Sequence, residues 1–94
     1  MSEKNKKYEK WKRSNKTIVF TNGCFDLLHQ GHIDLLCKAS SYGDKLVVGI
    51  NSDESVRKLK GSNRPVENEK IRKKKLMKLK FVNDVFIFHD LTPL

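Results

Sequence analysis

The sequence contains few of the residues that cross-link or interrupt a chain: two cysteines, two prolines and five glycines among 94 residues. Two cysteines supply no disulfide framework, which excludes the small disulfide-stabilised scaffolds typical of secreted proteins. No stretch approaches the ~18 consecutive apolar residues of a membrane-spanning helix. The lysine- and asparagine-rich start also lacks the apolar core of a signal peptide. We therefore expect one small cytoplasmic domain with reduced thiols and no membrane contact.

Acidic residues are scarce relative to basic ones, with 11 Asp and Glu against 20 Lys and Arg and a net charge of +9. The basic residues concentrate in residues 1–16, which carry seven basic and two acidic groups, and in residues 57–80, which carry eleven and two. Such clusters attract nucleotides, sugar phosphates or nucleic acids. A small basic nucleic-acid-binding protein therefore stays open as an alternative, although the chain lacks an aromatic stacking platform, which weighs against nucleic acid as the partner.

Hydrophobic patterning predicts strands alternating with helices. The expected strands cover residues 17–21, 46–50 and 82–88, and the expected helices cover residues 31–41, 53–59 and 69–80. This order predicts an α/β fold, a Rossmann-like parallel sheet with flanking helices and right-handed crossovers. Residues 1–15 precede it as a basic arm or a short helix. If helical, this segment would lay Tyr8 and Trp11 on the domain.

The last predicted helix has a clear start and an apolar face. Asn68 precedes it and is a favourable N-cap residue. Ile71, Leu76 and Leu79 recur at helical spacing and should be buried, while the lysines between them should face water.

The segment that joins the first strand to the next helix is the most informative. It reads T-N-G-C-F-D-L-L-H-Q-G-H over residues 21–32. Glycine lets the backbone approach an anion closely, and N–H groups at a helix N-terminus carry partial positive charge. His29 and His32 can both point at one ligand above this turn. The turn follows a parallel strand, where α/β proteins bind ligands, so we expect a phosphate site. Alternatively, the histidines only cap the helix.

Two cysteines flank the histidines, so zinc binding has to be weighed. Cys24, His29, His32 and Cys37 form the pattern C-x4-H-x2-H-x4-C. On a helix, Cys37 lies about 140° around the axis from His32, so we expect its thiol to turn toward the sheet. We therefore predict no protein-held metal site.

These motifs resemble a known family. The two segments G-C-F-D and H-Q-G-H, together with G-D-K-L-V-V-G-I-N-S-D over residues 43–53, resemble the cytidylyltransferase-like superfamily of nucleotidyltransferases. The likeness covers roughly residues 16–93. Residues 21–26, 51–53, 60–61 and 64–66 most resemble the adenylyltransferase domain that acts on heptose 1-phosphate in lipopolysaccharide precursor synthesis. Glycerol-3-phosphate cytidylyltransferase is the next closest likeness.

The resemblance implies an activity and its substrates. A nucleotidyl group, AMP rather than CMP, would pass from a nucleoside triphosphate to a sugar or polyol phosphate with release of pyrophosphate. Magnesium would arrive with the triphosphate rather than in a protein cage. The nucleotide-binding residues implied by motif position are Gly23, Cys24, Phe25, His29, Gly31 and His32.

The resemblance also implies which residues act on the phosphates of the nucleotide and of the acceptor. The resemblance assigns His29, His32 and Lys60 to catalysis, and it places Lys58 and Arg72 against substrate phosphates. A solvated surface role stays open for each of Lys58, Lys60 and Arg72.

The likeness stops at Thr92-Pro93-Leu94, before a glycine-rich segment and a Ser-Thr helix start that family members use around the nucleotide. We therefore expect residues 16–94 to be a C-terminally incomplete domain. A three-stranded sheet would expose apolar edges, so we expect a homodimer or a complementing chain. A catalytically incomplete nucleotide-binding fragment or regulator is the remaining alternative.

Overall fold

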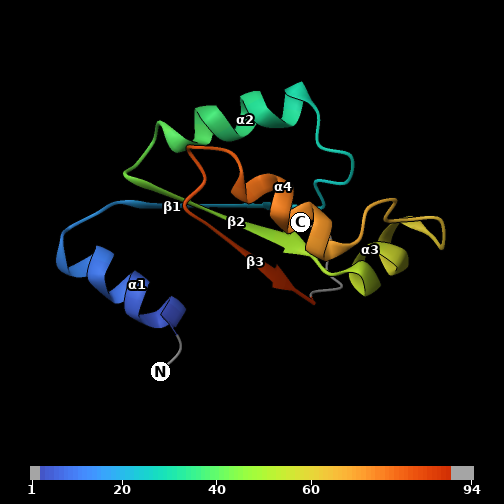
Figure 1. The fold of residues 1–94 in the computed structure, drawn as a ribbon, viewed down its shortest axis with the longest axis horizontal. Coiled ribbons are helices and arrows are strands. Elements are labelled where there is room, and N and C mark those ends of the chain that lie inside the picture. Colours follow the sequence, from blue (N-terminus) through green and yellow to red (C-terminus); the bar gives the residue numbers. More distant parts are fainter. Residues whose placement is uncertain (1–2, 90–94) are drawn as a thin grey trace.

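The computed structural model describes residues 3–89, in which helices and strands alternate (Figure 1). The elements are α1 (Glu3–Arg13), β1 (Ile18–Gly23), α2 (Gln30–Ser40), β2 (Lys45–Asn51), α3 (Asp53–Lys60), α4 (Glu69–Met77) and β3 (Asp84–Phe88). No helix in this range is both long and apolar enough to cross a membrane. The segment Thr92-Pro93-Leu94, which bears on the expected incompleteness, lies outside the described residues.

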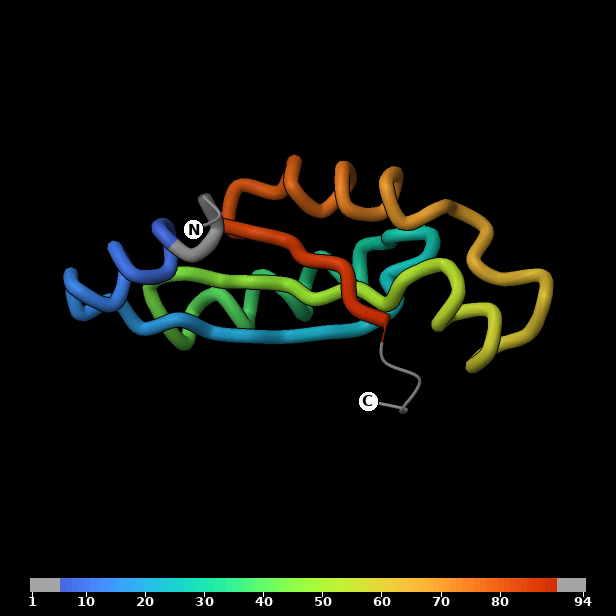
Figure 2. Tube along the Cα trace, turned by 90° about the horizontal axis from the view of Figure 1, so that it is seen from below, coloured from blue at the N-terminus to red at the C-terminus, as the bar shows by residue number. Residues whose placement is uncertain are grey.

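The strands form one parallel sheet in the order β1-β2-β3, which confirms the predicted parallel α/β architecture. β1 extends two residues beyond the prediction, because Asn22 and Gly23 still pair with Gly49 and Ile50 of β2. Parallel strands end at a common edge, and α3 lies there. Helix α1 lies at the opposite end of the sheet (Figures 1 and 2). The residues that follow the strands are thereby brought together.

Helices α2 and α4 cover one face of the sheet through a common apolar core. Leu36 of α2 and Leu76 of α4 are fully buried there. The core consists of Phe25, Leu36, Leu46, Val48, Ile50, Leu76, Val82 and Val85. Burying each large aliphatic side chain contributes about 1.5–3 kcal/mol, so this cluster fixes both helices against the strands.

Two predicted orientations are wrong. On α4, Ile71 is 43% exposed, while the neighbouring Arg72 occupies the buried position at 1%. Adjacent helical residues differ by about 100° around the axis, so only one of the two can face the sheet. On α2, Leu36 takes the inward position and Cys37 is exposed rather than turned toward the sheet. Helix α4 also ends at Met77, three residues before the predicted end.

Helix α1 is docked on the amino-terminal end of the sheet. Trp11 is 9% exposed, and the Tyr8 hydroxyl donates a hydrogen bond to Asp84 Oδ2 at 2.7 Å. The ammonium groups of Lys7 and Lys45 lie 5.4 and 5.6 Å from the centre of the Trp11 ring. The residues from 3 to 13 therefore form a packed helix rather than a loose arm.

Candidate functional site

A pocket of about 720 Å³ lies at the carboxyl edge of the sheet. It is lined by Asn22, Gly23, Cys24, Phe25, Asp26, His32, Asn51, Leu59, Lys60 and Arg64. The walls come from the turn after β1, the ends of β2 and α3, and the α3–α4 loop, residues 61–67. Among the residues singled out from sequence, the pocket brings together the Gly23 turn, His32 and Lys60. It does not include His29, Gly31, Lys58 or Arg72 among its lining residues.

The turn after β1 has an unusual backbone that its surroundings hold in place. Phe25 and Leu27 have φ angles of 50° and 57°, a left-handed conformation that costs a non-glycine residue of order 1–3 kcal/mol. The Phe25 ring is buried and lies over Gly23, where an added Cβ would meet ring carbon Cε2 at 3.1 Å. The absence of a side chain at Gly23 therefore lets the Phe25 ring pack closely against the Gly23 backbone.

His29 and His32 build the start of α2 with one nitrogen each. His29 is the N-cap, and its Nδ1 accepts a hydrogen bond from the Gly31 N–H at 3.1 Å. The His29 N–H in turn donates to His32 Nδ1 at 3.3 Å. The two rings stack with centroids 3.9 Å apart. Each Nδ1 acts as an acceptor, so each neutral imidazole carries its proton on Nε2. The histidines therefore cap the helix through Nδ1. Among the contacts described for these residues, the Nε2–H of each ring is left to donate to a ligand.

His32 is held in its neutral form. Its pKa is lowered by burial, and further by electrostatic interaction with the neighbouring His29 and Lys60. Protonation at Nδ1 would also remove the acceptor that the His29 N–H uses. Near neutral pH, His32 consequently enters the pocket as a hydrogen-bond donor and not as a cation.

The three cations expected at phosphates lie in different environments. Lys60 is exposed and lines the pocket. Lys58 instead forms an ion pair with Glu54 on the exposed side of α3, with Nζ and Oε1 3.4 Å apart. Thus only Lys60 of these two lysines is placed to meet a ligand in this pocket.

Arg72 serves as an internal clamp and is not among the residues that line the pocket, so its expected contact with a substrate phosphate stays a prediction. Its side chain is fully buried. Its Nη1 donates to the carbonyl oxygens of Cys24 and Asn51 at 2.9 and 2.8 Å, and its Nε donates to the Glu67 carbonyl at 3.0 Å. Nη2 pairs with Asp53 Oδ1 at 2.8 Å. The guanidinium therefore joins the carboxyl ends of β1 and β2 to α3 and to the α3–α4 loop.

Asn51 is a pocket residue to which sequence reasoning assigned no role. It is 2% exposed, and its Oδ1 lies 3.6 Å from the Cys24 thiol, which donates to it. Its Nδ2 is buried without a hydrogen-bond partner among the described residues. Leaving a buried donor unpaired costs about 1–3 kcal/mol. The place of Asn51 at the carboxyl end of a buried strand was the available signal.

The family model described as Cytidylyltransferase-like matches residues 20–94. This chain belongs to the cytidylyltransferase-like family. The resemblance inferred from the H-Q-G-H motif is therefore confirmed. A solved relative supports the same conclusion, the crystal structure of the lipopolysaccharide core biosynthesis protein from Thermoplasma volcanium GSS1. It aligns with a TM-score of 0.73 and 32% sequence identity, over 79% of this chain and 59% of that chain.

Curated relatives of this cytidylyltransferase-like chain are much longer. The bifunctional protein HldE of Koribacter versatilis is 54% identical over 85 residues, which is 90% of this chain and 18% of the relative. The bifunctional protein HldE of Campylobacter fetus subsp. fetus is 58% identical over 82 residues, again 18% of its length. This chain thus spans less than a fifth of the length of these two curated relatives.

Proposed function

We propose that this chain binds a magnesium–nucleoside triphosphate in the pocket and acts in nucleotidyl transfer to a phosphorylated sugar. AMP is the proposed group and a heptose 1-phosphate-like compound the proposed acceptor, as the sequence resemblance implies. One observation carries the proposal: His32, preset as a neutral Nε2–H donor, shares the pocket with Lys60 and Arg64. A donor at a helix N-terminus combined with two cations suits a polyphosphate.

The reaction needs positioning and charge stabilisation rather than a covalent nucleophile. An acceptor phosphate oxygen would attack the α-phosphorus in line, and the bond to the β-phosphate oxygen would break as pyrophosphate leaves. His32 would donate from Nε2 to a phosphate oxygen on which charge develops, while Lys60 and Arg64 would neutralise the phosphates. The backbone of Gly23, Cys24 and Phe25 would contact the nucleotide.

Magnesium would enter as part of the substrate. Asp26 is the one acidic residue among the described residues that line the pocket, and its carboxylate already accepts hydrogen bonds from Arg64, Val66 and Glu67. The pocket therefore offers donors and cations for the triphosphate, and the triphosphate oxygens would hold the ion.

Pyrophosphate release tests this function. Folded chain, checked by circular dichroism, is incubated with magnesium and either ATP or CTP across a panel of sugar and polyol phosphates. We expect release with ATP and an aldose 1-phosphate of the heptose class. Release with CTP and a polyol phosphate would overturn the adenylyl assignment. Nucleotide binding without any release would instead identify a binding fragment or regulator.

We further propose that another polypeptide segment pairs with the open sheet edges, either in a second copy or in a complementing chain. β1 and β3 are both edge strands of the described sheet, and Phe20 of β1 is 64% exposed. Unpaired edges favour association. Light scattering should therefore give a mass above that of one chain. A monodisperse monomer that shows pyrophosphate release would contradict this.

A further inference from the structure

Asp26 connects two segments that are forty residues apart. Its Oδ2 accepts hydrogen bonds from the Val66 N–H at 2.8 Å and from Arg64 Nη1 at 3.3 Å, and its Oδ1 accepts from the Glu67 N–H at 3.0 Å. The carboxylate is 6% exposed. Burial alone would raise the pKa of Asp26, but the two backbone donors and the Arg64 guanidinium together lower it. The charged carboxylate is therefore well satisfied, and it joins the turn after β1 to the α3–α4 loop.

The α3–α4 loop forms one wall of the pocket. Arg64 lines the pocket from this loop, and Lys60 precedes it at the end of α3. Val66 of this loop adds little buried apolar surface, since it is 60% exposed. The loop base is held separately, because Arg72 donates to the Glu67 carbonyl and Lys75 forms an ion pair with the Glu67 carboxylate. The hydrogen bonds to Asp26 thus fasten the part of the loop that carries Arg64 and Val66 to the turn after β1.

We propose that Asp26 is a positioning residue of the pocket, whose carboxylate holds the α3–α4 loop so that Arg64 and Lys60 face the phosphate groups of the bound ligand. The identity of that ligand rests on the proposed function, whereas the fastening of the loop does not. Asp26 itself takes no part in the chemical step. It acts through the loop, from the same turn that carries the nucleotide-binding backbone.

The negative charge of Asp26 allows the proposal to be tested by the direction in which ligand binding changes when Asp26 is replaced. Asp26 is a negative charge beside a site for a negatively charged ligand. On Coulomb grounds alone, its removal should strengthen the binding of an anion. If Asp26 positions the loop, its removal should weaken binding, because Arg64 is no longer held at the pocket. The two effects have opposite directions and one titration separates them.

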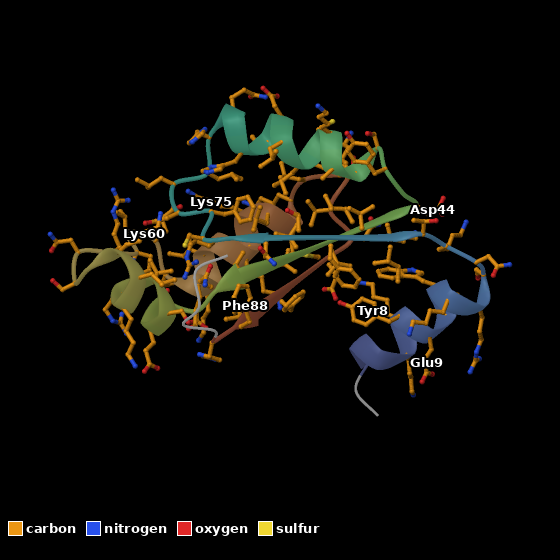
Figure 3. The ribbon with its side chains drawn as sticks, turned by 180° about the vertical axis from the view of Figure 1, so that it is seen from behind. Tyr8, Glu9, Asp44, Lys60, Lys75 and Phe88 are labelled. Atoms are coloured by element: carbon orange, nitrogen blue, oxygen red, sulfur yellow. The ribbon has the colours of Figure 1, made fainter. Side chains whose placement is uncertain are left out.

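The substitution Asp26→Asn keeps the shape of the side chain but removes its charge and one acceptor oxygen. Binding of magnesium–ATP is measured by calorimetry, and we expect Kd to rise about tenfold, the size of one lost charge-assisted hydrogen bond. Asp44→Asn is the matched control, because Asp44 Oδ2 also accepts a backbone N–H, that of Thr17 at 2.8 Å. Figure 3 shows Asp44 at the far end of the sheet from Lys60. Unchanged or tighter binding by Asp26→Asn would overturn the proposal.

A double-mutant cycle distinguishes positioning from a general loss of structure. Arg64→Gln should weaken magnesium–ATP binding in the wild-type background and have little further effect after Asp26→Asn. Additive effects would show that Asp26 does not act through Arg64, and would contradict the proposal.

Hydrogen exchange in the ligand-free protein tests the fastening whether or not ATP binds. The Val66 and Glu67 amides should exchange slowly in the wild type, although Val66 is exposed, and about tenfold faster in Asp26→Asn. Exchange in β2 should stay unchanged. If Asp26→Asn does not fold, the wild-type rates decide: unprotected Val66 and Glu67 amides would overturn the proposal. Failure of ATP binding with protected amides would instead count against the proposed function alone.

Discussion

Replacing Arg72 with leucine should lower the free energy of unfolding by about 3–5 kcal/mol, as expected when one member of a buried ion pair is removed. The change leaves the carbonyl oxygens of Cys24 and Asn51 and the Asp53 carboxylate without the donor that now satisfies them. A domain of this size has a total stability of only about 5–15 kcal/mol. We therefore expect Arg72→Leu to be largely unfolded at moderate urea concentrations. Urea titration followed by circular dichroism measures this.

Lys74→Leu is the matched control for that experiment. Lys74 lies two residues further along α4 and is exposed, so the same loss of one positive charge should change the stability by less than about 0.5 kcal/mol. Similar losses in both variants would mean that Arg72 contributes only net charge, contrary to the clamp seen in the structure.

Replacing His32 with alanine should lower the rate of pyrophosphate release by about 100-fold or more, the typical effect of removing one donor that stabilises developing charge. The variant removes the imidazole of His32, a pocket-lining residue, and with it the Nε2–H donor and the acceptor for the His29 N–H. The second loss resembles the removal of a helix cap, which costs about 1 kcal/mol. A steady-state assay of folded protein, at temperatures well below the unfolding transition, separates the two losses.

His89→Ala is the control for the histidine experiment. His89 is exposed just after β3 and does not line the pocket, so its removal should leave the rate unchanged. A His32→Ala variant that keeps most of its activity while losing stability would show that His32 only caps α2.

The parts of the fold that follow from local pattern were predictable from the sequence. The continuous apolar run of β2 correctly indicated a parallel strand, and the glycine turn after β1 correctly indicated a strand-to-helix connection. Asn68 caps α4 as predicted, with its Oδ1 accepting the Ile71 N–H at 2.9 Å. These features depend on residues close together in the chain, and they can therefore be predicted from local sequence patterns.

The parts that depend on distant partners were not predictable in the same way. Periodicity places apolar Ile71 inside and charged Arg72 outside, and the structure reverses them. The buried guanidinium is stabilised because carbonyl oxygens from three separate segments and the Asp53 carboxylate converge on it. Asp26 is similar, since its partners lie about forty residues away. The hydrogen-bond partners of Arg72 and Asp26 therefore cannot be predicted from local sequence spacing.

Nuclear magnetic resonance of the uniformly ¹⁵N-labelled chain, titrated with magnesium–ATP, tests most directly whether the pocket at the carboxyl edge of the sheet is the nucleotide site. We expect saturable shifts of the amides around Gly23 and His32 and of those from Lys60 to Glu67. The amides around Tyr8 in α1, at the opposite end of the sheet (Figure 3), should not move. Shifts confined to α1 or to the lysines of α4, or no shifts at all from a folded chain, would contradict this location of the site.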